Sequence, residues 1–390
     1  MIVPLKYIWR SLWTRRLTTV LTLGGIALVA FVFAAVLMLA HGLEETLIET
    51  GSEDNVIALR RSATSELVSQ IERDGANVLL SQPEIAIGQG GKSFASTETY
   101  IIINLGKKET NDMGNIVVRG ISPQAIDLRP QLKITDGRMF EFGKDEIIVG
   151  KSINAKFAGA DIGQRIKFGD DWWTVVGVFE AAGTAFESEI WGDVEQFMPA
   201  FGRPVFSTVT ARLKGKNGFA ALKSRMENDP RTQYIDLKIE RAYYQEQSKL
   251  MSDFIKILGL IVTIIFSIGA VIGAAITMYA AVANRTREIG TFRALGFSRP
   301  SVYLAFLVES IFIAIIGGSV GIALASLMSF FSFSTTNFSS FSELAFGFRM
   351  SPDIIIGTLI FSLVMGIFGG FFPAVRATRL KIIDSLRAAS

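Results

Sequence analysis

Four long apolar blocks constrain this chain more than any other feature of its sequence. They are Val20–Ala40, Phe254–Ala283, Val302–Phe330 and Ile354–Val375. Each block is long enough to cross a bilayer, because about 20 apolar residues in a helix span the hydrocarbon layer. The first block exceeds the apolar core of about 7–15 residues in a cleavable signal peptide, so we interpret it as an uncleaved signal anchor. The sequence therefore predicts a polytopic α-helical membrane protein with four transmembrane helices.

The distribution of basic residues predicts the orientation of these helices. The stretches 1–19, 284–301 and 376–390 together carry 12 Lys and Arg residues but only two acidic residues. Short segments rich in Lys and Arg stay on the cytoplasmic side of a membrane. We therefore expect both termini and residues 284–301 to be cytoplasmic, and residues 41–253 to be periplasmic or extracellular.

The content of cysteine and histidine excludes several kinds of catalysis. The chain has no cysteine and one histidine, His41, so thiol catalysis, zinc clusters and histidine-based triads are excluded. The tripeptides at 91–93 and 150–152 read Gly-Lys-Ser, like the end of a phosphate-binding loop. That loop needs another glycine five residues earlier, where this chain has Ala86 and Asp145. We expect no catalytic residue, no bound cofactor and no metal in this chain.

The long segment between the first two apolar blocks predicts an α+β domain. Short runs with strand character alternate with helical stretches. The predicted strands are Asn55–Leu59, Thr99–Leu105, Ile116–Val118, Glu146–Val149, Gln164–Phe168, Trp172–Phe179, Val205–Arg212 and Tyr234–Ile239, and the predicted helices are Ser65–Arg73, Ser152–Phe157 and Phe219–Glu227. Strands near both ends indicate that the chain leaves and re-enters the membrane at neighbouring points. The carboxylates form no recognisable metal-binding or glycosidase pattern, so we expect a solvated acidic surface.

The second transmembrane helix is predicted to extend beyond the membrane. No proline occurs between Arg241 and Ile289, so one helix can continue through most of this stretch. Its polar beginning, residues 241–253, would form a stalk beneath the outer domain, paired with residues 41–50 after the first helix. The alternative is an ordinary linker next to the membrane.

Residues 284–301, here named the coupling segment, have the spacing of a short helix. Ile289, Phe292 and Gly296 fall on one helical face, with arginines around them. Such a helix either docks into the groove of a partner protein or lies on the membrane surface. Composition alone does not distinguish these two alternatives.

Within the apolar blocks, one acid and several glycines are notable. Glu309 lies deep in the third block, where an ionisable group is a functional hypothesis because burying its charge is costly. Glu309 either forms a structural hydrogen bond or takes part in coupling the motion of the spanning helices to a partner. Glycine pairs with three intervening residues allow helices to approach closely. These pairs are Gly269 and Gly273, Gly317 and Gly321, and Gly366 and Gly370. At least one pair is expected to pack within the protomer.

Several motifs resemble those of a known permease family. Residues 285–297 (RTREIGTFRALGF), 306–310 and 317–321 resemble the FtsX-like permease domain, and residues 373–387 resemble its end. Segments 137–140, 145–151 and 173–179 are similar to the periplasmic core of MacB-type permeases, and residues 9–17 resemble their entry helix. The likeness covers nearly the whole chain. MacB itself also carries a fused ATPase, which we do not expect in this chain.

The resemblance implies a transmembrane subunit of an ABC transport system of the MacB, LolC/LolE and FtsX type, in the inner membrane of a bacterium. It also implies a mechanism, in which ATP-driven closure is relayed through the stalk without passage of substrate through the membrane. The implied partners are two separate ATPase subunits that bind ATP and Mg, a second copy or a homologous permease, a periplasmic adaptor with an outer-membrane channel, and membrane lipid, but no nucleic acid. The residues implied to contact the ATPase are Arg285, Arg287, Glu288, Ile289, Phe292, Arg293 and Leu295.

The expected organisation combines these elements. It comprises a cytoplasmic amphipathic entry helix (1–19), transmembrane helix 1 with its stalk (20–50), a periplasmic core domain (51–240), a stalk with transmembrane helix 2 (241–283), the coupling segment (284–301), transmembrane helix 3 (302–330), a short periplasmic loop (331–353), transmembrane helix 4 (354–375) and a cytoplasmic tail (376–390). Within the core domain, the resemblance implies a porter-like lobe at 51–130 plus 205–240 and an inserted lobe at 131–204.

Three functions agree with this organisation. The first is export of a periplasmic substrate, the second is extraction of lipoproteins or lipids from the outer leaflet, and the third is regulation of a periplasmic hydrolase or sensor without transport. A membrane-anchored periplasmic enzyme is a more remote alternative. Neighbouring genes for an adaptor, a lipoprotein-sorting protein or a cell-wall hydrolase would discriminate among the first three. The substrate does not follow from the sequence.

Overall fold

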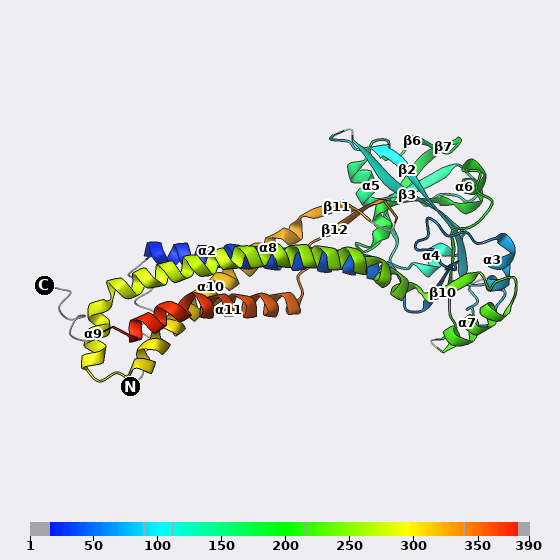
Figure 1. Ribbon diagram of the computed structural model, residues 1–390. Coiled ribbons are helices and arrows are strands. Elements are labelled where there is room, and N and C mark those ends of the chain that lie inside the picture. The colour runs from blue at the N-terminus through cyan, green and yellow to red at the C-terminus, as the bar shows by residue number, and fades with distance from the viewer. Residues whose placement is uncertain (1–15, 89–90, 111, 216, 338–339, 381–390) are drawn as a thin grey trace. The chain divides into compact units, whose positions relative to one another are not determined.

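The computed structural model describes residues 16–88, 91–110, 112–215, 217–337 and 340–380 (Figure 1). The chain divides into two compact units. The membrane unit comprises the chain up to Gly42, Asp253–Phe331 and the chain from Phe348 onward, and the core unit comprises Leu43–Ser252 and Ser332–Gly347. Most of the predicted entry helix and the end of the tail lie outside the described residues.

Among the described residues, four helices are long and apolar enough to cross a membrane, as the sequence predicts. They are α2 (Arg16–Ile48), α8 (Glu240–Asn284), α10 (Arg299–Ser326) and α11 (Pro352–Thr378). The side chains of Ser298 and Ser351 accept hydrogen bonds from the first turns of α10 and α11, and each helix has proline in that turn. Serine caps and early prolines favour helix initiation, which explains where these two helices begin.

Two of the three glycine pairs pack inside the membrane unit. A Cβ atom on Gly321 would lie 2.6 Å from the carbonyl oxygen of Ala27 in α2. Gly366 and Gly370 of α11 face Ala314 and Ser310 of α10 in the same way, and α10 and α11 lie side by side (Figure 1). A side chain at these positions would push the helices apart, so the glycines permit the observed packing.

The core unit is built on one mixed ten-stranded sheet, with the strand order β10-β1-β9-β2-β3-β8-β5-β7-β4 and β6 paired with β7. The strands are β1 (Asn55–Arg60), β2 (Ala95–Gly106), β3 (Met113–Ile121), β4 (Lys133–Gly137), β5 (Glu146–Gly150), β6 (Arg165–Phe168), β7 (Asp171–Glu180), β8 (Glu189–Asp193), β9 (Thr208–Arg212) and β10 (Ile235–Ile239). The pairs β3–β8 and β5–β7 are parallel and the others are antiparallel.

The helices of the core unit are short and connect these strands. They are α3 (Arg73–Leu80), α4 (Ala125–Leu128), α5 (Lys151–Lys156), α6 (Val194–Ala200) and α7 (Gly218–Asn228), together with a 3-10 helix (Ala185–Ser188). One apolar cluster gathers around Val56, Ala211 and Leu237, and another around Ile147 and Trp173. The sheet continues from one cluster to the other through β2 and β3. The boundaries of the two predicted lobes stay a prediction.

The predicted secondary structure of the core unit agrees with the structure in most places. All eight predicted strands and the helices α5 and α7 are present, whereas the strands β4 and β8 and the helices α3, α4 and α6 were not predicted. The predicted helix Ser65–Arg73 is wrong. The chain forms turns there, Ile71 pairs with Phe206 in an isolated bridge, and helix α3 begins only at Arg73. The bridge gives the backbone of Ile71 a partner on another segment, which overrides the local helical pattern.

The two ends of the long domain lie next to each other, as the sequence predicts. Strands β1 and β10 are antiparallel neighbours, with Val56 opposite Ile239. The amide of Arg241 donates to the carbonyl of Ser52 at 3.3 Å, and the hydroxyl of Ser252 donates to Glu44 at 3.2 Å. The last turns of α2 and the first turns of α8 therefore contact each other within the core unit.

The predicted short loop 331–353 contains a β-hairpin instead of irregular chain. Its strands are β11 (Ser332–Thr336) and β12 (Glu343–Gly347), and they belong to the core unit. The side chains of Leu344 and Phe346 are 4% and 5% exposed, so one face of β12 is buried. Burial alternates along β12, as is typical of a strand with one buried face, and the apolar residues Leu344 and Phe346 at a spacing of two were the available sequence signal.

Candidate functional site

The coupling segment forms a short helix between two of the long helices. Helix α9 (Thr286–Ala294) follows α8 after Asn284, and the chain then turns at Gly296 with φ of 93°. Glycine adopts positive φ at little cost, so it allows the sharp turn that precedes the serine cap of α10. The predicted helical spacing of this segment is therefore confirmed.

Glu309 forms a buried ion pair with the residue that precedes α9. The guanidinium of Arg285 donates to Glu309 at 2.9 Å and to Glu288 at 3.0 Å, and it lies over the ring of Phe306. Arg285 is 8% exposed and Glu309 is 4% exposed. A buried charge needs such a partner, which accounts for the acid within an apolar block. The pair connects the start of α9 to α10.

The seven residues predicted to contact an ATPase separate into two groups. Arg285 and Ile289 are buried inside the membrane unit, where Ile289 packs with Val302 and Ala374. Phe292 and Arg293 are partly exposed, and the ring of Phe292 packs edge-on against Phe297. The exposed residues are Arg287, Glu288 and Leu295, of which Leu295 is 67% exposed. Contact of any of the seven with a partner stays a prediction.

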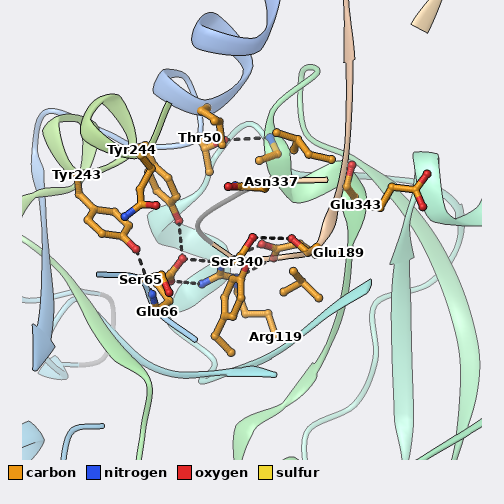
Figure 2. A pocket seen from close by; sticks show the side chains of 18 residues that line it. Thr50, Ser65, Glu66, Arg119, Glu189, Tyr243, Tyr244, Asn337, Ser340 and Glu343 are labelled. Atoms are coloured by element: carbon orange, nitrogen blue, oxygen red, sulfur yellow. Dashed lines mark hydrogen bonds and ion pairs between the residues drawn. The ribbon is translucent and has the colours of Figure 1, made fainter. Parts of the chain in front are cut away.

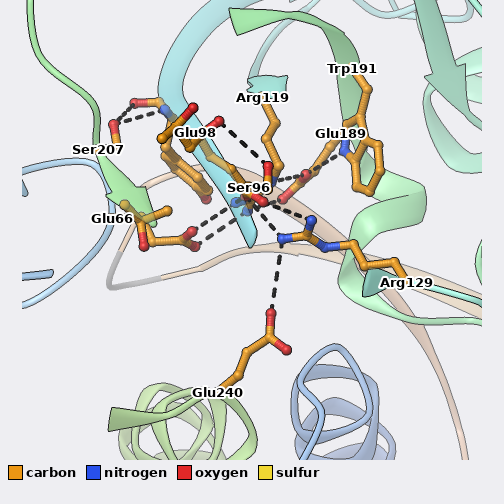
Figure 3. Close-up of polar contacts among 12 residues, drawn as sticks. Glu66, Ser96, Glu98, Arg119, Arg129, Glu189, Trp191, Ser207 and Glu240 are labelled. Carbon is orange, nitrogen blue, oxygen red and sulfur yellow. Dashed lines mark hydrogen bonds and ion pairs between the residues drawn. The ribbon is translucent and has the colours of Figure 1, made fainter. Parts of the chain in front are cut away.

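A second candidate site is a buried cluster of charges centred on Arg119 in the core unit (Figure 3). Arg119 lies on β3, between Glu98 of β2 and Glu189 of β8, and these strands are neighbours in the sheet. Its guanidinium donates to Glu189 at 2.7 and 2.9 Å, to Glu66 at 2.7 Å and to Glu98 at 2.8 Å. Arg119 is 1% exposed, so these charge-assisted bonds are shielded from water.

The cluster reaches the first residue of α8 through a second arginine. Arg129 pairs with Glu98 at 2.7 Å, and its other terminal nitrogen lies 3.9 Å from Glu240. Glu240 begins α8 and accepts hydrogen bonds from the amide of Ser52 at 3.0 Å and from Asn55 at 2.9 Å. The start of α8 is thus tied to the middle of the sheet by polar contacts.

Burial and the two arginines shift the pKa values of these acids in opposite directions. Burial of Glu98 disfavours its charge, but Arg129 and Arg119 outweigh that effect and lower its pKa. Burial raises the pKa of Glu189, although Arg119 opposes the shift. Burial also raises the pKa of Glu240, against the opposing effect of Arg129. Four carboxyl groups share two arginines, so full ionisation of all six groups would leave an excess of negative charge.

The expectation of a solvated acidic surface is wrong for these acids. Glu66, Glu98, Glu189 and Glu240 are all at most 5% exposed. The physical reason is that Arg119 and Arg129 supply opposite charge and hydrogen-bond donors inside the unit. The sequence signal was Arg119 within the otherwise apolar run Ile116–Ile121, because a charge in a buried strand needs buried partners.

A small cavity of about 40 Å³ adjoins the Arg119 cluster (Figure 2). It is lined by Glu66, Arg119, Glu189 and Tyr244, with Ser340 from the hairpin. This volume accommodates a few water molecules but no organic substrate. Within the parts of the chain that the structure describes, no group of three or more His, Cys, Asp or Glu side chains is arranged to hold a metal ion.

Four membrane-spanning helices and an α+β domain between the first two define a multi-pass membrane protein. The model of the MacB-like periplasmic core domain matches residues 19–229, and the model of the FtsX-like permease C-terminal domain matches residues 260–382. The first match alone covers more than half of the chain. The chain belongs to the MacB-like family, and its residues 260–382 form an FtsX-like permease domain.

Curated relatives and solved structures are similar to the chain at low identity. The pyoverdine export ATP-binding/permease protein PvdT of Pseudomonas entomophila is 25% identical over 99% of this chain and 60% of PvdT. The macrolide export ATP-binding/permease protein MacB of Neisseria gonorrhoeae is 25% identical over 97% of this chain and 59% of MacB. The chain thus spans about 60% of the length of these relatives. The crystal structure of the periplasmic region of MacB from Actinobacillus actinomycetemcomitans matches with a TM-score of 0.39 and 15% identity, over 51% of this chain and 94% of that structure.

Proposed function

We propose that the chain is the permease subunit of a MacB-type ABC transport system in a bacterial inner membrane. It transmits the ATP-driven motion of a separate ATPase to its periplasmic core unit and so drives export of a periplasmic substrate. The observation that carries this proposal is helix α8, which is unbroken from Glu240 to Asn284. At 1.5 Å per residue, its 45 residues extend over about 68 Å. A continuous helix of this length transmits displacement, whereas a flexible linker would absorb it.

The proposed partners follow from this mechanism. Two ATPase subunits bind ATP and Mg and contact the coupling segment on the cytoplasmic side, where both termini also lie. The matched relatives carry the words ATP-binding and permease in one name, and residues 260–382 match a permease model, which supports a function together with an ATPase. Their names also include export, which supports export as the direction of transport. A periplasmic adaptor and an outer-membrane channel are the further partners in this proposal.

The mechanism is tested by making α8 flexible. Inserting Gly-Gly-Ser after Gln247 should uncouple the core unit while leaving assembly and ATP hydrolysis intact, because each glycine destabilises a helix by only about 1 kcal/mol. The chain lacks cysteine, so a spin label on Lys133→Cys, an exposed position of β4, is unique in each copy. The ATP-dependent change in distance between the labels of two copies is measured in the complex with the ATPase.

An Ala-Ala-Ala insertion at the same place is the matched control. It adds the same length and rotation as Gly-Gly-Ser but keeps the helix rigid. The distance change should therefore persist in the alanine variant and be lost in the glycine variant. An unchanged distance response in the glycine variant would mean that α8 does not carry the motion.

The exposed glycine pair of α8 is the proposed contact with a second copy. Among the described residues, nothing lies within 4 Å of the position of a Cβ atom on Gly269 or Gly273. The most apolar window of α8 is only 17% buried, against 33% or more in the other three long helices. Because the other two glycine pairs are occupied within the protomer, this pair is available for close approach by another helix.

Gly273→Leu should therefore weaken self-association at least tenfold, because a large side chain separates the two helices. Gly357→Leu in α11 is the control, since Gly357 likewise has no described atom within 4 Å of its Cβ position. Dissociation of the dimer is measured by dilution in detergent. Equal self-association of both variants would exclude this face of α8 and favour a homologous permease or another face as the partner.

A further inference from the structure

The β11–β12 hairpin docks where the ends of α2 and α8 also meet the core sheet (Figure 2). The cavity beside Arg119 is lined by Leu47 of α2, Tyr243 of α8 and Leu344 of β12. Three separate stretches of the chain therefore converge on the middle of the sheet. All of them belong to the core unit.

Specific polar contacts hold the hairpin in this position. Glu343 forms an ion pair with Lys107 at 2.9 Å, and the amide of Ala345 donates to the hydroxyl of Ser188 at 3.0 Å. The side chain of Glu343 is 13% exposed and that of Lys107 is 35% exposed, so this ion pair is partly shielded from water. The inner face of β12 adds the buried side chains of Leu344 and Phe346. The combination of buried apolar groups and directed polar contacts is typical of a defined docked state.

The receiving surface is shaped for the hairpin. A Cβ atom on Gly114 of β3 would lie 2.7 Å from the carboxylate of Glu343, so glycine leaves the space that this side chain occupies. Phe341 has a positive φ of 57°, a conformation that a bulky residue rarely adopts. Its ring is 62% exposed, but its carbonyl accepts a hydrogen bond from Asn115 of β3 at 2.8 Å. The docked contact thus supports a backbone conformation that is unfavourable by itself.

The hairpin is also directly connected to the last two spanning helices. Helix α10 continues into a 3-10 helix (Leu327–Phe330) and then into β11, whereas β12 is followed after four residues by α11. Helices α2 and α8 enter the core unit through their own ends. Consequently, each of the four long helices has a short connection to the core unit.

We propose that the β11–β12 hairpin is a second force-transmitting connection, through which motion of α10 and α11 reaches β3 and β8 of the core sheet. This inference rests on the proposed function, because it assumes that ATP-driven motion is delivered to the core unit. With only the adjoining ends of α2 and α8 as rigid connections, the core unit could pivot about the place where these two helices enter it. A docked hairpin supplies a second point of attachment. Movement of the α10–α11 pair relative to the α2–α8 pair then becomes a torque on the sheet.

The test loosens the docked hairpin by substitutions within the hairpin, so that no residue of the spanning helices is changed. Leu344→Ser removes a buried apolar contact of β12, whereas Phe333→Ser changes a residue of the same hairpin that is 51% exposed. Amide hydrogen exchange of residues 340–347 is measured in the purified full-length chain in lipid nanodiscs. We expect exchange to accelerate at least tenfold in Leu344→Ser and less than twofold in Phe333→Ser. Unchanged exchange in Leu344→Ser would overturn the docking and with it the proposal.

The second measurement asks whether the docked hairpin transmits motion. The ATP-dependent distance change between Lys133→Cys labels is compared in both variants within the ATPase complex. We expect Leu344→Ser to lose at least half of the change while ATP hydrolysis stays within twofold of the parent, and Phe333→Ser to keep the change. A full distance change with a released hairpin would overturn this inference alone. Absence of any ATP-dependent change in the parent protein would instead contradict the proposed function.

Discussion

Replacing Arg119 with methionine should destabilise the core unit by about 3–5 kcal/mol, because removing one member of a buried charge cluster leaves its partners buried and unpaired. Glu66 and Glu189 would each lose their guanidinium contacts, while Glu98 would keep Arg129. A loss of this size is a large part of the stability of a typical domain. Thermal and urea unfolding of the full-length protein, followed by tryptophan fluorescence, measures it, because Trp173 and Trp191 are fully buried in the core unit.

The same substitution at Arg73 is a matched control. Arg73 pairs with Glu195 at 2.7 Å, but both side chains are 53% exposed. Exposed ion pairs contribute about 0–1 kcal/mol, so Arg73→Met should unfold almost like the parent. Equal stability of the Arg119 and Arg73 variants would show that the buried cluster does not stabilise the core unit.

The loss of stability caused by Arg119→Met should also depend on pH. Burial raises the pKa of Glu189 even with Arg119 present, and loss of that arginine removes the opposing effect and raises the pKa further. A group whose pKa is higher in the folded protein than in the unfolded chain stabilises the fold at low pH and loses this effect as pH rises through the higher value. The free energy of unfolding of the variant should therefore be closest to that of the parent at acidic pH. The difference between the two free energies should grow towards neutral pH.

Leu295→Asp should abolish activation of the ATPase by this chain. Leu295 is 67% exposed at the end of α9, so the change places a charge on the surface proposed to contact the ATPase without disturbing the packing of Ile289 or Arg285. A charge without a partner in an apolar contact costs enough to weaken binding at least a hundredfold. Co-purification of the ATPase with the chain, and ATP hydrolysis in membranes, measure the effect.

Val68→Asp is the control for this substitution. Val68 is also exposed, at 56%, but it lies in the core unit, far along the chain from the coupling segment. The control should retain the ATPase and its activity, and both variants should insert and fold alike. Normal recovery of the ATPase with Leu295→Asp would remove α9 as the contact site.

Much of the architecture follows from local patterns in the chain. Apolar length identifies the four spanning helices, and alternating patterns identify the eight strands from β1 to β10 that were predicted. The resemblance carried by the RTREIGTFRALGF stretch agrees with the permease model that matches residues 260–382. Local patterns fail where the partner of a residue is distant, as at Ile71, whose bridge to Phe206 replaces the expected helix.

The candidate sites show the same division. The sequence indicates that Glu309 needs a partner but not that Arg285 is this partner, since the two residues are on different helices. It places the glycine pairs but does not tell which pair is occupied within the protomer. From the sequence, Glu98 and Glu189 were expected to lie on a solvated surface. Their shared partner Arg119 lies on a third strand, so the pairing is not visible in the local sequence of either acid.

By itself the sequence determined the number of spans, the α+β class of the intervening domain and the family. These follow from helix length, strand alternation and local motifs, which depend on residues close together in the chain. Only the tertiary structure decided that four acids are buried around two arginines and that a serine-rich loop forms a hairpin docked on the core sheet. These features depend on which distant segments meet. That outcome is set by the packing of the whole unit, because a buried charge or an exposed strand edge is stable only once its partner is in place.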